Sequence, residues 1–136
     1  MAESADSPDA LALSSLLQLS MPVQDIDRAV AFYRDQLGAR FLFQAGTLGF
    51  FDLDGVRLML AVPEGAGGEG GSVLYFRVPE VRAAYAVLRA RGVAFEGGGS
   101  GEPHVVHRDD RHELWMAFFR DSEGNLLAIT AEVPLG

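Results

Sequence analysis

Residues 18–38 read QLSMPVQDIDRAVAFYRDQLG, an alternating segment followed by an amphipathic one. Apolar and polar residues alternate before Val23, which is typical of a strand with one face against a core. Asp25 precedes apolar residues at three- and four-residue spacing, so it is well placed to cap a helix from Ile26 to Leu37. Gly38 then predicts the end of that helix, because glycine readily adopts the left-handed conformation found there.

A weaker copy of this stretch follows at residues 73–92, VLYFRVPEVRAAYAVLRARG, in which Val78 matches Val23. A second similarity joins DLDGVRLML at 52–60 to DSEGNLLAI at 121–129, where Gly55 matches Gly124 at a wider sequence offset than the first pair. Two similarities in the same order indicate a module of about fifty residues that is used twice.

Each copy is predicted to form a βαβββ module, and two such modules form one α+β domain. The expected organisation is a disordered acidic tail at 1–13 and a single domain at 14–134, made of module one at 14–62, a glycine-rich linker at 63–71 and module two at 72–134. We expect the two modules to form a curved mixed sheet around a cleft, with the helices on the outer face.

Strands are predicted from alternation and from turn residues on either side of each run. The expected strands are 14–23, 39–44, 48–53 and 56–62 in module one, and 72–78, 93–96, 114–119 and 125–133 in module two. The second helix is expected at 80–91, and the segment before residue 114 is expected to be a surface loop.

Charge and composition exclude several classes of function. The net charge is −8, and the sequence contains no lysine and no cysteine. Phosphate backbones attract clusters of basic residues, so nucleic-acid binding is not expected. Disulfides and thiolate metal ligands are excluded, and no apolar run reaches the roughly eighteen residues of a membrane span. An acidic N-terminus does not suit a secretory signal, so a cytoplasmic location is expected.

The early motif PVQDIDRAVAFYRDQLGARF at 22–41 and the late motif FFRDSEGNLLAI at 118–129 resemble the vicinal oxygen chelate superfamily. That superfamily includes glyoxalases, extradiol dioxygenases and bleomycin-resistance proteins. The resemblance covers residues 14–134 and implies paired βαβββ modules and a homodimer. In many members it also implies a divalent metal that polarises substrate oxygens.

In the metal-dependent members, the ligands lie on the first and fourth strands of each module. The resemblance places these positions at Gln18, Met59, Val73 and Ala128, and the two repeat offsets pair them in the same way. One amide, one thioether and two hydrocarbon side chains do not suit a hard divalent cation. No cofactor is therefore predicted, and the chain is similar to metal-free members that bind drugs or other small molecules.

If these four positions face the cleft, residues two places away on each strand share that face. The predicted ligand contacts are Gln18, Ser20, Arg57, Met59, Tyr75, Arg77, Trp115 and Thr130. The two arginines can pair with an anionic ligand or with carboxylates at the surface. The sequence does not decide which face of strand 114–119 lines the cleft, and either Trp115 or its neighbours can do so. By the same alternation Leu17 and Leu19 are expected to face the helices.

All three histidines, His104, His107 and His112, lie in PHVVHRDDRHELWMAFF at 103–119. Three histidines, or histidines with Glu113, suit zinc or iron, so a divalent metal here is the alternative to a surface loop without metal. A histidine beside a carboxylate can also move a proton, which makes His107 and Glu113 the candidate catalytic residues.

The leading hypothesis is a small-molecule-binding protein whose ligand lies in the cleft between the modules without the usual metal. The alternative is an enzyme, a lyase, isomerase or dioxygenase of the same superfamily, that uses a displaced His/Glu site. A third possibility is a structural or regulatory dimer with a closed cleft.

Overall fold

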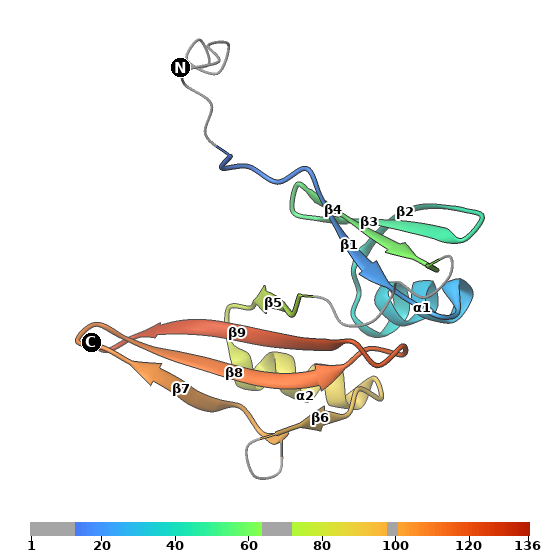
Figure 1. Cartoon of the computed structure of the whole chain (residues 1–136). Helices are drawn as coiled ribbons and strands as arrows, with labels where there is room; N and C mark the ends of the chain where they lie inside the picture. Colours follow the sequence, from blue (N-terminus) through green and yellow to red (C-terminus); the bar gives the residue numbers. More distant parts are fainter. Residues whose placement is uncertain (1–12, 64–71, 98–100) are drawn as a thin grey trace.

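The structure is a computed structural model that describes residues 13–63, 72–97 and 101–136. The predicted tail and linker fall on residues that lie almost wholly outside these ranges. Two modules follow one another along the chain, the first coloured blue to green and the second yellow to red in Figure 1.

The elements of each module have the following bounds. Module one contains β1 (Gln18–Pro22), α1 (Ile26–Ala31), η3 (Phe32–Gln36), β2 (Arg40–Ala45), β3 (Leu48–Leu53) and β4 (Val56–Ala61). Module two contains β5 (Leu74–Arg77), α2 (Val81–Ala90), β6 (Phe95–Glu96), β7 (His104–Arg108), β8 (His112–Arg120) and β9 (Leu126–Pro134). The predicted α+β fold with two tandem βαβββ modules is confirmed.

One predicted element is wrong. The segment before residue 114, expected to be a loop, contains β7, which pairs antiparallel with β8. The pairing has an irregularity between Val105 and His107, where the register shifts. Because that irregularity breaks the alternation of side chains, the sequence of this strand does not show the usual period of two.

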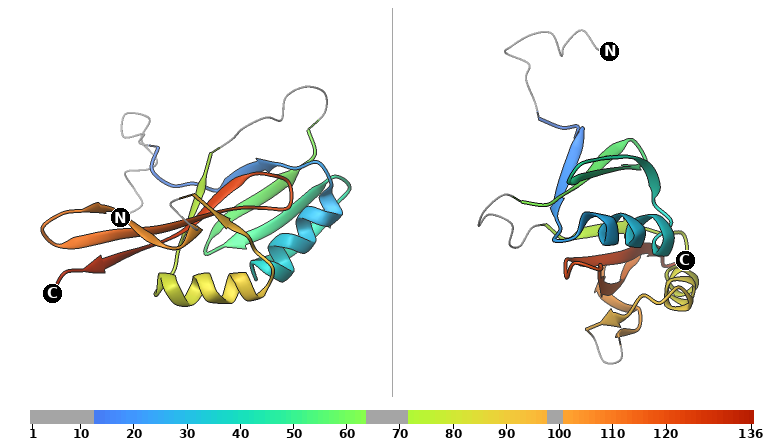
Figure 2. Two further views of the ribbon diagram at one scale, coloured as in Figure 1. Left: turned by 90° about the horizontal axis from the view of Figure 1, so that it is seen from below. Right: turned by 90° about the vertical axis from the view of Figure 1, so that its right-hand side faces the viewer.

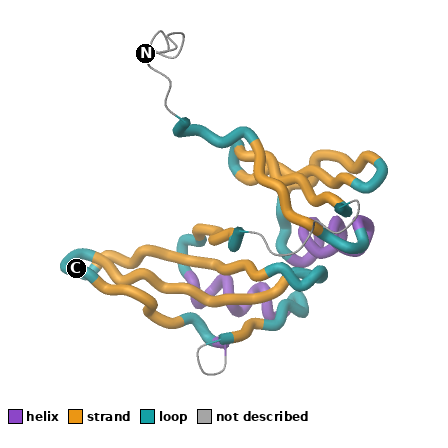
Figure 3. The backbone as a smooth tube through the Cα atoms, in the orientation of Figure 1, coloured by secondary structure: helices purple, strands orange, loops and turns teal. Residues whose placement is uncertain are grey.

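The strands form two sheets, and no strand pairing joins the two sheets within the described part of the chain. Sheet A has the order β1-β4-β3-β2, and sheet B has the order β5-β9-β8-β6 with β7 also paired to β8. In each sheet the first and last strands of the module are parallel neighbours, and the other pairs are antiparallel. Figure 3 shows the helices in purple against these strands.

Strand register confirms the internal repeat. Leu19 pairs with Leu58 in sheet A, and Leu74 pairs with Leu127 in sheet B. The offset between Val23 and Val78 therefore carries β1 onto β5, while the offset between Gly55 and Gly124 carries β4 onto β9. Since the two offsets come from different segments, their agreement with the pairing shows that the modules share one architecture.

The helix of module one begins where expected, but the α-helix ends at Ala31 and a π-helical segment, η3, completes it before Gly38. The side chain of Asp25 accepts a hydrogen bond of 3.0 Å from the backbone N–H of Arg28, and Gly38 has a φ of +73°. Helix α1 packs closely on β3, because a Cβ at Gly49 would lie 2.7 Å from Val30 Cγ2. The absence of a side chain at Gly49 therefore sets the distance between helix and sheet.

Helix α2 repeats this arrangement in module two. Glu80 caps it by accepting hydrogen bonds from the backbone N–H groups of Arg82 and Ala83. Within the described residues, neither helix nor any other helical segment has the length of apolar helix that a bilayer requires.

The two modules share one apolar core. Its largest fully buried side chains include Tyr33 and Phe51 from module one and Phe119 from module two. Leu19 packs against this core as expected, whereas Leu17 is 74 % exposed. The expectation for Leu17 was wrong because β1 begins one residue later, at Gln18.

Helix α1 lies between sheet A and module two, as Figure 1 and the right-hand view of Figure 2 show. Val30 on one side of α1 meets β3, while Arg28 reaches Glu123 in the turn between β8 and β9. The face of sheet A that α1 does not cover therefore points away from module two. Within the described residues, this face and the uncovered face of sheet B do not enclose a cleft together.

Candidate functional site

The face of sheet A opposite α1, here called open face A, carries four of the predicted ligand contacts. Its residues are Gln18, Ser20, Arg57, Met59, Phe43 and Phe50, which follow from the register of β1 to β4. The alternate residues Leu58 and Leu60 are fully buried on the inner face. Alternation along each strand thus separates a polar and aromatic surface from the core.

The side chains of open face A contact one another. The rings of Phe43 and Phe50 are stacked with centroids 4.5 Å apart, and the Arg57 guanidinium lies 5.5 Å from the centre of the Phe50 ring. Arg57 Nε donates a 2.8 Å hydrogen bond to Gln18 Oε1, and Gln18 Nε2 lies 3.8 Å from Met59 Sδ. A flat aromatic surface beside a cation suits a planar ligand that carries negative charge.

The uncovered face of sheet B, here called open face B, carries Tyr75, Arg77 and Thr130 together with Met116 and Phe118. Tyr75 is 50 % exposed, and its ring meets Phe118 edge to face with centroids 6.3 Å apart. Arg77 Nη1 lies 3.3 Å from an oxygen of Glu132 in an exposed ion pair. The surface is again aromatic, with a cation at its side.

Trp115 lies on the inner face of sheet B, apart from the other predicted contacts. Its ring packs under the Arg82 guanidinium of α2 at 4.9 Å, and its Nε1 donates a 3.1 Å hydrogen bond to Glu113. Glu113 also pairs with Arg108 across the β7–β8 hairpin. Residue 115 therefore does not share a face with Tyr75 and Thr130.

His104 pairs with Met116 and His107 pairs with Leu114, so the register places both on open face B. His112 Nδ1 lies 3.9 Å from Asp109 Oδ1 at the turn between β7 and β8. Glu113 is on the inner face, which separates it from His107. Among the described residues no group of three His, Asp or Glu side chains is arranged to hold a metal ion.

The four positions to which the resemblance assigns metal ligands, Gln18, Met59, Val73 and Ala128, do not fit a hard cation. Gln18 Oε1, the single oxygen in the set, already accepts a hydrogen bond from the Arg57 guanidinium, which would repel a cation. Met59 offers a thioether, and Ala128 is fully buried and has no donor atom in its side chain.

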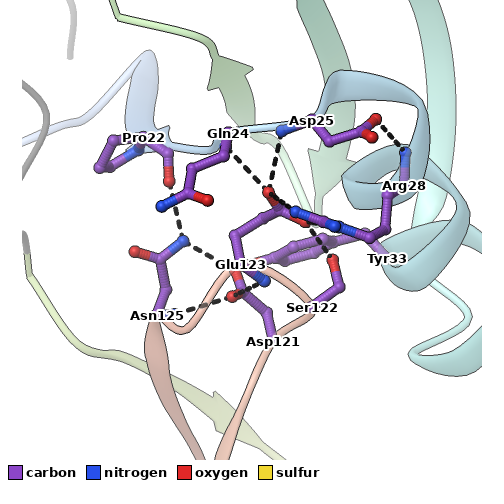
Figure 4. Close-up of polar contacts among 9 residues, drawn as sticks. All are labelled: Pro22, Gln24, Asp25, Arg28, Tyr33, Asp121, Ser122, Glu123 and Asn125. Carbon is purple, nitrogen blue, oxygen red and sulfur yellow. Dashed lines mark hydrogen bonds and ion pairs between the residues drawn. The ribbon is translucent and has the colours of Figure 1, made fainter.

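The late motif DSEGN holds the two modules in their relative positions (Figure 4). Asp121, which is 6 % exposed, accepts a 2.6 Å hydrogen bond from the Tyr33 hydroxyl of module one. Asn125 Nδ2 donates to the carbonyl of Pro22 at 2.9 Å and to Asp121. The hydrogen bonds from Tyr33 and to Pro22 therefore join the motif to module one.

Glu123 completes this junction. Its side chain is 1 % exposed, and it accepts hydrogen bonds from the backbone N–H groups of Gln24 and Asp25 and from Arg28. The hydrogen bond from Arg28 is the main reason that the pKa of Glu123 is lowered to about 2. The carboxylate is therefore charged throughout the physiological range.

Sequence reasoning named Tyr75 on open face B but missed Phe118 there, and it missed Phe43 and Phe50 on open face A. The turn at Asp54 and Gly55 has positive φ at both positions, as expected for a two-residue hairpin, and this fixes the pairing of Phe50 with Met59. Phe50 was therefore predictable from the sequence. Phe43 and Phe118 were not, because a bulge precedes Phe43 and a longer loop separates β8 from β9.

Two tandem βαβββ modules, whose uncovered faces carry aromatic and arginine side chains, define the class of this protein. The model of the Glyoxalase/Bleomycin resistance protein/Dioxygenase superfamily matches residues 15–129. The chain belongs to this superfamily. No curated protein matches it.

Several solved structures have the same fold. The antibiotic-binding protein TnmS3 from Streptomyces sp. CB03234 is 25 % identical, with a TM-score of 0.67 over 90 % of this chain and 98 % of that one. A lactoylglutathione lyase from Agrobacterium tumefaciens is 21 % identical, with a TM-score of 0.68 over 88 % and 95 %. A superfamily member from Sphaerobacter thermophilus is 20 % identical, with a TM-score of 0.71 over 90 % and 100 %.

Proposed function

We propose that this protein is a homodimeric small-molecule-binding protein, in which open face A of one copy and open face B of the other enclose a planar aromatic ligand. The observation that carries the proposal is that α1 separates open face A from module two, so one chain alone does not close a cleft. Exposed aromatic side chains such as Phe43 and Tyr75, 47 % and 50 % exposed, are typical of a surface that another molecule covers.

Strand edges support the dimer. Strand β1 is at one edge of sheet A and β5 is at one edge of sheet B, and each pairs with one strand only in the described residues. A two-fold dimer can place β1 of one copy beside β5 of the other twice, which closes both edges. The name of TnmS3, an antibiotic-binding protein, supports binding rather than turnover.

The ligand is held without a divalent metal in this proposal, since the residues at the usual metal positions do not fit one. The enzyme alternative is not favoured, because His107 and Glu113 lie on opposite faces of sheet B. Metal analysis of the purified protein tests this part, and stoichiometric zinc, nickel, manganese or iron would overturn it. A cytoplasmic location stays a prediction.

The binding experiment uses anthracene-9-carboxylate, a planar aromatic anion, followed by its fluorescence anisotropy. Phe50→Ala and Tyr75→Ala are each expected to weaken binding about tenfold, because a buried aromatic stack is worth about 1–2 kcal/mol. Arg89→Ala, at an exposed position on α2, is the control and is expected to bind like the parent chain.

Subunit mixing tests whether the site is shared between copies. In a mixed dimer of Phe50→Ala and Tyr75→Ala, one site carries both changes and the other carries neither. We therefore expect mixing to restore one site of parental affinity per dimer, with light scattering giving twice the chain mass of 14.6 kDa. No recovery on mixing, or a monomer, would contradict the shared site, and no binding at all would favour a structural dimer.

A further inference from the structure

A cavity of about 480 Å³ lies where the two modules meet, on the helix side of sheet B and apart from both open faces. Module one contributes Leu37, Ala39 and Leu53, and α2 contributes Ala83, Ala84 and Val87. The floor is formed by side chains of sheet B that are almost fully buried, such as Phe119. Its volume is within the range of small-molecule sites, which is roughly 300–1,000 Å³.

The cavity follows one side of α2 from end to end. Its lining residues on this helix recur at three- and four-residue spacing and form one stripe: Glu80, Ala83, Ala84, Val87, Leu88 and Arg91. At 1.5 Å per residue this stripe is about 16 Å long. Val87 is 47 % exposed along it, so the cavity is an elongated groove with apolar walls.

The two ends of the groove differ in charge and in how their charges are satisfied. Glu80, at one end, already accepts two backbone hydrogen bonds from α2. Arg91, at the other end, donates from Nη1 to the carbonyl of Gln36 at 3.2 Å. No carboxylate in the described ranges pairs with Arg91, in contrast to Arg28 and Arg77.

The position of the Arg91 guanidinium is set by module one. A Cβ at Gly38 would lie 3.3 Å from Arg91 Nη1, so this nitrogen sits against the segment that also supplies Leu37 and Ala39. A guanidinium presents several N–H donors in a planar fork, which suits a carboxylate. The groove therefore combines an apolar trough with an anion-binding group at one end.

We propose that this groove binds an elongated amphipathic monocarboxylate, with its hydrocarbon body along α2 and its carboxylate at Arg91. The hydrocarbon body removes the apolar walls from water, and the carboxylate adds a charge-assisted hydrogen bond. Because both modules line the groove, the ligand bridges them at a site separate from the cleft of the proposed function.

The first test maps decanoate on the full-length protein by NMR of methyl groups. We expect decanoate to shift the methyl signals of Leu37, Leu53 and Val87 and to leave those of Met59 and Met116, on the open faces, unchanged. Shifts confined to the two methionines would show that decanoate binds the cleft, and this would overturn the proposal. The absence of any shift would do the same.

Two matched pairs of variants test the groove and its charged end by calorimetry. Ala83→Phe fills the groove and is expected to abolish decanoate binding, whereas Ala86→Phe, on the same helix but outside the lining, is expected to leave it unchanged. Arg91→Gln is expected to weaken decanoate about tenfold, with decan-1-ol unaffected, while Arg89→Gln changes neither.

Thermal unfolding checks that each variant is folded. If Ala83→Phe does not fold, the comparison of Arg91→Gln with Arg89→Gln still tests the proposal. Equal affinities of Arg91→Gln and Arg89→Gln for decanoate would overturn the proposal. It would also be overturned if Ala83→Phe changed the oligomeric state of the protein, because a second copy of the chain would then occupy the groove. Decanoate binding to the groove and anthracene-9-carboxylate binding to the open faces are measured separately. This proposal and the proposed function can therefore fail independently.

Discussion

The Tyr33 hydroxyl donates a 2.6 Å hydrogen bond to Asp121 Oδ2, which belongs to the other module, and both side chains are buried. Asp121 also accepts hydrogen bonds of 2.8 Å from the backbone N–H groups of Glu123 and Asn125. Burial, reinforced by the neighbouring Asp121 carboxylate, raises the pKa of Tyr33 far above its ordinary value of 10.0. The hydroxyl therefore stays protonated and donates at every physiological pH.

Replacing Tyr33 by phenylalanine should destabilise the protein by about 1–3 kcal/mol, because Asp121 would remain buried with one partner fewer. Urea unfolding at one fixed protein concentration measures the loss, since the stability of an oligomer depends on concentration. Tyr85→Phe is the control, because the Tyr85 hydroxyl has one 3.4 Å contact with Arg89 near the surface. Equal unfolding midpoints for the two variants would show that the junction hydrogen bond contributes nothing.

Acid should weaken the junction through Glu123. Its pKa is lowered from 4.5 to about 2, mainly by the Arg28 hydrogen bond, so the folded chain binds fewer protons here than the unfolded chain. The stability that this carboxylate supplies is complete above about pH 4.5 and is lost as the pH falls toward about 2. Glu123→Gln should therefore be less stable than the parent at neutral pH and lose less stability over that acid window.

Urea midpoints across the acid range measure this difference. Asp35→Asn is a matched control, because the pKa of Asp35 is also lowered by an arginine, Arg34, yet both side chains are exposed. Its pH dependence should follow the parent closely, since exposed ion pairs add little. If Glu123→Gln kept the full acid sensitivity of the parent, other carboxylates would account for it.

Gly49 sets the spacing between α1 and sheet A. A methyl group at this position would lie 2.7 Å from Val30 Cγ2, so Gly49→Ala should cost about 1–3 kcal/mol by overpacking. The double variant with Val30→Ala removes the clashing atom and should be more stable than the sum of the two single changes predicts. Strict additivity in thermal or urea unfolding would show that the helix shifts without strain.

The repeat made much of this fold predictable. Two offsets in the sequence matched β1 with β5 and β4 with β9, and the strand pairings within the two sheets agree with that match, because each module repeats the same side-chain alternation. The cap at Asp25 marked the start of the first helix, and the repeat placed the start of the second at residue 80, where Glu80 makes the matching hydrogen bond. These are short-range features, and short-range features can be read directly from a sequence.

The failures have physical causes as well. Residues Leu114–Phe119 are apolar on both faces of β8, so no alternation showed that Trp115 points to α2. The position of α1 between sheet A and module two depends on hydrogen bonds to Glu123, which lies far along the sequence from Gln24 and Asp25. Such long-range contacts decide which faces stay open, and they leave no local pattern in the sequence.

Phe50 and Phe51 are neighbours on β3 and should separate binding from stability. Phe51 is fully buried and pairs with Tyr33 and Phe41, so Phe51→Ala should lose about 3–5 kcal/mol by leaving a cavity. Phe50 lies on open face A, where Phe50→Ala gives up the stack with Phe43 and should cost only about 1 kcal/mol. Urea unfolding and anthracene-9-carboxylate binding, measured on both variants, check the pair. If Phe50→Ala proved as unstable as Phe51→Ala, the Phe50 side chain would belong to the core. Open face A would then lack the aromatic residue on which the proposed ligand stacks.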